Sequence, residues 1–128
     1  MDGWQAITRG QPEVDGVDAD YPGLLNVRVP LSAYPPDEWQ DFFLRPVGVG
    51  LSMSMHSPDL RGDEVVLRPP DSEVERYVKH VDERIVAANA RYEAEVLPKR
   101  RAALQRADAA AAQEEERLRA ARERLGKL

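Results

Sequence analysis

The sequence predicts an α+β fold, in which a small, mainly antiparallel sheet of about three strands and one short helix precede a long C-terminal helix. Two patterns carry this prediction. In the first half of the chain, apolar residues alternate with polar or small ones, which is the period of a strand with one buried face. In the second half they recur every three or four residues, which is the period of a helix with one buried stripe.

Three segments show strand alternation, at residues 25–31, 47–56 and 64–68. Pro30 has no amide hydrogen to donate, so the first strand lies at an edge of the sheet or ends there. The second strand sets large apolar residues against a face of small ones from Gly48 to His56, which packs closely, lies exposed or contacts a ligand. We expect the third strand to form a hairpin with the second through turn residues 57–63.

The short helix is expected to follow Pro35 and Pro36, because prolines are tolerated and acids are favoured in a first helical turn. Trp39, Phe42 and Phe43 follow at helical spacing, and Pro46 ends the helix. Three aromatic residues on so short a helix predict packing into a core rather than a ligand site.

The long helix is expected to start at Ser72, which forms a capping box with Glu75. No glycine occurs between Gly62 and Gly126 to end it, but Pro98 predicts a kink or break, at a cost of about 3 kcal/mol in a helix interior. Its first half carries one apolar stripe, widened by two further side chains. The stripe is Val74, Val78, Val81, Ile85, Ala88 and Tyr92, and the two additions are Tyr77 and Val86.

We divide the chain into an irregular acidic arm at residues 1–22, an α+β domain at 23–97 and a projecting helix rich in Ala, Arg and Glu at 98–128. In the arm, only Trp4 and Ile7 are expected to dock on the domain. Residues 1–71 carry 12 acidic and 5 basic side chains, whereas residues 72–128 carry 11 and 13. This distribution does not favour a general polyanion binder, which needs a concentrated positive face.

Chemistry-bearing motifs are absent from the sequence. The chain has no cysteine, and neither His56 nor His80 has a metal-ligand spacing, so both are expected at the surface or its boundary. We found no glycine-rich phosphate loop or catalytic motif, and we predict a non-enzymatic protein without a cofactor or metal. No apolar run is long enough for a membrane span, and residues 1–10 lack a basic region followed by an apolar one, so we expect a cytoplasmic protein without a membrane partner.

The projecting helix supplies the candidate partner-binding residues. It holds few large apolar side chains, too few to offset its own ordering entropy, so it needs a partner or it frays. Its apolar residues form a weak heptad seam, in which Glu114 occupies a position where an apolar residue is expected. The seam consists of Leu104, Ala107, Ala111, Leu118, Ala121 and Leu125.

A basic cluster directly after Pro98 is the second candidate. Lys99, Arg100, Arg101 and Arg106 would contact phosphates in a nucleic-acid-binding accessory protein, or they are solvated or paired with Glu93 and Glu95. The favoured prediction is a protein–protein interaction or oligomerisation module whose C-terminal helix docks on another protein or on its own copy. Nucleic-acid binding is the alternative, and a small hydrolase or transferase has no motif behind it.

Overall fold

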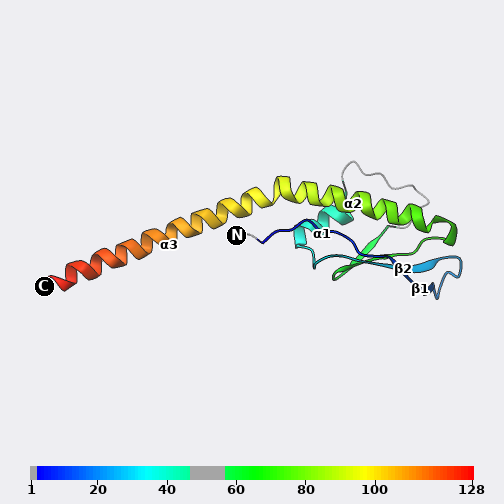
Figure 1. Cartoon of the computed structure of the whole chain (residues 1–128), viewed down its shortest axis with the longest axis horizontal. Helices are drawn as coiled ribbons and strands as arrows, with labels where there is room; N and C mark the ends of the chain where they lie inside the picture. Colours follow the sequence, from blue (N-terminus) through cyan, green and yellow to red (C-terminus); the bar gives the residue numbers. More distant parts are fainter. Residues whose placement is uncertain (1–2, 47–56) are drawn as a thin grey trace.

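A computed structural model of the chain describes residues 3–46 and 57–128. Its elements are, in order, β1 (Glu13–Val17), β2 (Leu25–Pro30), α1 (Asp37–Leu44), β3 (Asp59–Arg61), β4 (Glu64–Leu67), a 3₁₀ turn (Asp71–Glu73), α2 (Val74–Glu95) and α3 (Leu97–Gly126). Everything before α3 gathers into a compact head, which we define as the described residues from 3 to 96, and α3 projects from it (Figure 1). The predicted α+β fold class is confirmed.

The sheet is antiparallel throughout and has the order β1-β2-β4-β3. The first predicted strand is confirmed as β2, which has one buried face and ends at Pro30. The predicted hairpin partner of β4 was wrong, because β4 lies between β2 and β3. The turn from β3 to β4 is only two residues long, since Gly62 takes a φ of +63° that tight hairpins require. The predicted strand at 47–56 lies outside the described residues.

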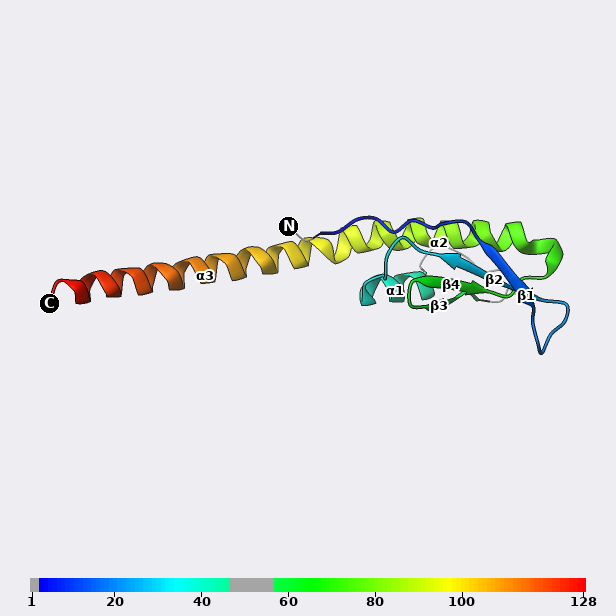
Figure 2. The same ribbon diagram turned by 60° about the horizontal axis from the view of Figure 1, so that its bottom comes forward.

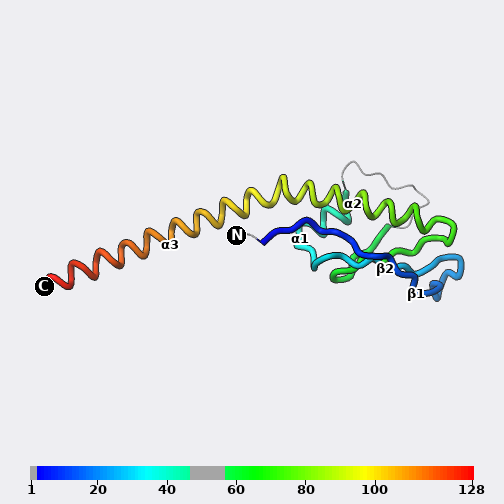
Figure 3. The backbone as a smooth tube through the Cα atoms, in the orientation of Figure 1, coloured from blue at the N-terminus to red at the C-terminus, as the bar shows by residue number. Residues whose placement is uncertain are grey.

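The predicted irregular arm contains a strand instead, because β1 pairs with β2. All five residues of β1 are exposed, so neither face imposes the apolar alternation that reveals a strand in a sequence. Before β1, the chain runs beside α2 (Figure 3), with the Trp4 ring 4.3 Å from that of Tyr92 and Ile7 buried in the core. Docking of these two side chains was predicted correctly.

The core lies between the sheet and α2 (Figure 2). α1 lies against α2 and the β3 edge. It buries Trp39 and Phe43, which confirms their predicted core role, while Phe42 is half-buried and packs against the core. On α2 the predicted stripe is buried or half-buried, but Val86 is 68% exposed because it lies on the far face of the helix. The side chains that bury the two faces against each other are Val27, Val29, Val65 and Leu67 of the sheet and Tyr77, Val81, Ile85 and Ala88 of α2.

The start of α2 corrects the predicted capping box. One 3₁₀ turn precedes the helix, and no side chain caps the start of this turn or the start of α2. Instead, the Glu73 amide donates to the Pro70 carbonyl oxygen at 2.9 Å. The turn follows two prolines and the isolated bridge from Leu24 to Pro70. Its backbone hydrogen bond takes the place of the side-chain cap.

The predicted kink at Pro98 is confirmed. α2 ends at Glu95, α3 begins at Leu97, and the axis bends by 36° near residue 96. Backbone bonds still cross the junction, because the Val96 amide donates to Tyr92 and the Arg100 amide donates to Val96. The helix therefore continues in a new direction and does not reverse.

Candidate functional site

The seam residues lie along α3, which spans 30 residues, or about 45 Å at 1.5 Å per residue. Only Leu97, at the base, is buried. Leu104, Leu118 and Leu125 are 47%, 44% and 67% exposed. The structure thus places the six predicted residues along one helix and leaves the large ones uncovered by the described chain; Ala107 and Ala111 are exposed and Ala121 is half-buried.

Interactions between neighbouring residues stabilise the C-terminal part of α3. Arg119 pairs with Glu116 and with Glu123, three residues before it and four after it. Alanine, arginine and glutamate also have high helix propensity. Such pairs add a few tenths of a kcal/mol each, so they favour the helix without using its leucines, which stay available for contacts.

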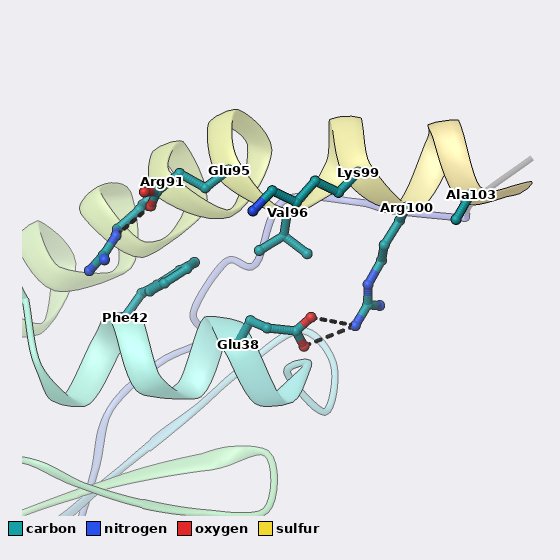
Figure 4. Close-up of a pocket in the computed structure, with 8 residues that line it drawn as sticks. All are labelled: Glu38, Phe42, Arg91, Glu95, Val96, Lys99, Arg100 and Ala103. Carbon is teal, nitrogen blue, oxygen red and sulfur yellow. Dashed lines mark hydrogen bonds and ion pairs between the residues drawn. The ribbon is translucent and has the colours of Figure 1, made fainter.

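The base of α3 is fixed to the head by an ion pair. Nη2 of Arg100 lies 2.9 and 2.7 Å from the two carboxylate oxygens of Glu38 on α1 (Figure 4), and its guanidinium carbon is 5.8 Å from the centre of the Tyr92 ring. The pKa of Glu38 is lowered, chiefly by a bond from its own backbone amide and then by Arg100. The pKa of Arg100 is raised by its hydrogen bond to Glu38.

A pocket of about 450 Å³ lies beneath the bend, between α1 and the junction of α2 and α3. The Arg91 guanidinium stacks 4.2 Å from the centre of the Phe42 ring and also pairs with Glu95. Figure 4 shows these groups along one side of the space and Arg100 with Glu38 at the other. The pocket is lined by Glu38, Phe42, Arg91, Glu95, Val96, Lys99, Arg100 and Ala103. Both of its arginines are paired with carboxylates, Arg91 with Glu95 and Arg100 with Glu38, which makes it a joint between elements rather than a concentrated anion site.

The basic cluster is not gathered into one face. Successive helical residues are rotated by about 100°, so Lys99, Arg100 and Arg101 point in three directions, and only Lys99 and Arg106 share a side. Arg100 is bound to Glu38, and Glu95 pairs with Arg91, which corrects the predicted pairing of the cluster with Glu95. The arrangement lacks the continuous positive stripe that phosphate contacts require.

His80 and Arg84 form a buried polar pair that the sequence did not reveal. The prediction of a surface or boundary His80 was wrong, since only 6% of His80 and 1% of Arg84 is exposed. Nε of Arg84 donates to Nε2 of His80 at 2.9 Å, and Nη1 donates to the Phe43 carbonyl at 2.9 Å. Burial, and then the charge of Arg84, lower the pKa of His80, so the ring is neutral and can accept this bond.

Arg84 therefore stabilises the C-terminal end of α1, where helix carbonyls lack partners and the helix dipole is negative. The sequence did contain a signal for this pair. His80 and Arg84 are four residues apart and fall within the apolar stripe of α2, between Tyr77 and Ala88. A polar residue at such a position has to find buried partners. The pair supports the structure of the head and lies apart from the exposed seam.

Metal centres and membrane-spanning helices are two other classes of site. In the described ranges, no three histidine or acidic side chains are grouped in a way that could hold a metal ion. Among the helices of these ranges, none combines the length and hydropathy needed to cross a membrane. Neither result identifies a site.

No protein-family model matches the chain, and searches of curated proteins and of solved structures found no similar protein.

Proposed function

We propose that the protein is a non-enzymatic interaction or oligomerisation module, in which α3 docks on a helix of another protein or of a second copy. One observation carries this proposal. The head buries or half-buries most of its large apolar side chains, whereas α3 buries only Leu97 and holds Leu104, Leu118 and Leu125 between 44% and 67% exposed along one helix. Exposed apolar residues in a helical row are typical of a surface that a partner helix covers.

The way in which α3 is attached supports the proposal. Leu97 is buried in the core and Arg100 binds Glu38, so the first turn of α3 is held at two points on the head. A helix that only covered its own domain would lie back on the head, whereas α3 leads away from it (Figure 1). In this proposal the head fixes the base of α3, so that the seam lies away from the head, where a partner can reach it.

We do not favour the nucleic-acid alternative, because Arg100 is engaged by Glu38 and the cluster spreads around the helix. For the location we propose the cytoplasm, since a chain without cysteine needs no oxidising compartment. The partner in this proposal is a protein surface, without a membrane or a cofactor.

A photo-crosslinking side chain placed at Ala111 tests the docking function in cells that make the protein. Ala109 provides the matched control, because it is also an exposed alanine but lies roughly 160° away around the helix. We expect discrete crosslinked products from position 111 and none, or far fewer, from position 109. Equal crosslinking from both positions, or none from 111, would contradict docking through the seam.

The oligomeric state of the purified chain then separates the two kinds of partner. Light scattering on the full chain and on a truncation ending at Leu97 should show assembly of the full chain only, if the partner is a second copy. A monomeric full chain with rapid hydrogen exchange throughout residues 102–128 would exclude self-association. Crosslinks at position 111 to a product of another mass would then identify a different protein as the partner.

A further inference from the structure

We propose that the ion pair between Arg100 and Glu38 is a latch across a proline hinge, and that it sets the direction in which α3 leaves the head. The inference concerns the geometry of the base of α3, and it holds whichever partner the seam binds.

The hinge is the junction that follows α2, from Val96 to Pro98. Pro98 has no amide hydrogen, so the Ala94 carbonyl lacks the donor that a continuous helix would provide, and the proline ring crowds that carbonyl. The backbone of Val96 departs from ideal helical values, with φ −103° and ψ −50°. Because one backbone hydrogen bond is missing and one residue departs from helical geometry, the two helices bend most easily at this junction.

The latch lies on the inner side of the bend. Figure 1 shows α1 on the concave side of the arch that α2 and α3 form, and Figure 4 shows Arg100 reaching down to Glu38 from that side. Because Arg100 is the second residue after Pro98, the contact joins the far side of the hinge to the head. Pro98 is exposed, which is consistent with a helix that bends away from its proline.

The anchor on α1 is firm. Glu38 immediately precedes Trp39, which is fully buried and donates its ring N–H to Asn89 at 2.9 Å. Asn89 lies on α2, so α1 and α2 are fixed to each other near the point where the latch closes. A bond from Arg100 to Glu38 therefore constrains α3 against a rigid reference.

A small rotation at this joint has a large effect at the tip. Gly126 lies 26 residues beyond Arg100, so the lever is about 39 Å long and each 10° of rotation moves the tip by about 7 Å. The latch is also within reach of solvent, because the side chains of Arg100 and Glu38 are 50% and 39% exposed. Salt weakens such a pair, which makes the latch reversible.

The test measures distances between the head and α3 in the full chain. The absence of native cysteine allows two nitroxide labels to be attached, at Asp63→Cys in the turn after β3 and at Ala112→Cys on α3. Pulsed electron spin resonance should give one narrow distance distribution at low salt. Glu38→Gln and Arg100→Gln should each broaden it at least twofold, and 1 M salt should broaden the distribution of the unmutated pair in the same way.

Two further variants make the result specific. The exchange Glu38→Arg with Arg100→Glu should restore the narrow distribution, because it rebuilds the pair with reversed charges. Glu95→Gln is the matched control, since it removes the Arg91–Glu95 pair at the same pocket without crossing the hinge, and it should leave the distribution narrow. Circular dichroism confirms that each variant is folded. The proposal is overturned if both single variants keep the narrow distribution, or if Glu95→Gln broadens it equally.

Discussion

The head and α3 are ordered by different interactions. In the head, side chains far apart in sequence bury one another, and Trp39, Phe43 and Val81 have no exposed surface. In α3 the residues after the base are exposed or at most half-buried. Burial of apolar surface is therefore the main source of stability for the head, whereas α3 depends on helix propensity and on its neighbours along the helix.

Their ion pairs differ as well, because the head has pairs between separate elements in addition to local ones such as Arg91 with Glu95. In the head, Arg9 pairs with Asp82 and Arg28 with Glu64, so each pair joins separate elements. The pairs of Arg119 on α3 stay within one turn or so of the helix. Long-range pairs help to position elements, while local pairs only support the helix that contains them. The latch at Arg100 joins a charged side chain of α3 to the head.

The largest effect on stability is expected from the centre of the head. Trp39→Ala should lower the free energy of unfolding by about 3–5 kcal/mol, because it opens a large cavity and leaves the Asn89 side chain without one of its donors. Urea unfolding measures this change. Trp39→Phe keeps most of the apolar volume and should cost clearly less. A loss below 1 kcal/mol for Trp39→Ala would contradict the central position of this side chain in the core.

The buried polar pair should give the next largest effect. Arg84→Met preserves much of the side-chain volume but leaves the His80 ring nitrogen and the Phe43 carbonyl without their donor. We expect a loss of about 2–3 kcal/mol in urea unfolding, since buried polar groups without partners are costly. Arg91→Met, which removes a half-exposed arginine two turns further along α2, is the matched control and should cost less.

Protonation of His80 should make the head less stable as the pH falls. The folded-state pKa of His80 lies below its ordinary value of 6.5, so below that pH the unfolded chain binds the proton more readily than the folded one. The stabilisation is thus complete above pH 6.5 and is lost on acidification, by at most about 1.4 kcal/mol per pH unit.

His80→Gln keeps an acceptor for Arg84 and cannot titrate, so its unfolding free energy should vary less between pH 7 and pH 5. The second histidine cancels in this comparison. Asp18 and Glu38 also have lowered pKa values, but their contributions are lost at more acidic pH, below their ordinary values near 4. Parallel pH profiles for the two proteins would show that His80 does not cause the slope.

The contrast between the regions also explains what the sequence could predict. Strand β2, α1 and the stripe of α2 were predicted because burial of one face imposes a visible period on the sequence. β1 was not predicted because all its residues are exposed, and β3 was not predicted because it has only three residues. A strand without a buried face leaves no periodic signal.

For the candidate site, the kink and the seam followed from local sequence, whereas the latch did not. Pro98 marks the hinge by its own chemistry, but Glu38 and Arg100 are 62 residues apart and only the fold brings them together. The pair of His80 and Arg84 could have been suspected from its position in the stripe, although its carbonyl partner on α1 could not. Docking through the seam remains a prediction.

The smallest effect on the head is expected from α3 itself. Leu118 is 44% exposed and lies far along the projecting helix, so Leu118→Ala should change the unfolding free energy of the monomeric chain by less than about 0.5 kcal/mol. The matched comparison is Ile85→Ala on α2, a buried apolar truncation that should cost about 2–5 kcal/mol. Urea unfolding at low protein concentration measures both, with the truncation ending at Leu97 as a third sample that should resemble the full chain. If Leu118→Ala proved as costly as Ile85→Ala while the chain stayed monomeric, α3 would have to pack on its own head, and the separation of the two regions would be wrong. If instead its cost rose with protein concentration, the leucine would be stabilising an assembly of copies, because only association makes stability depend on concentration.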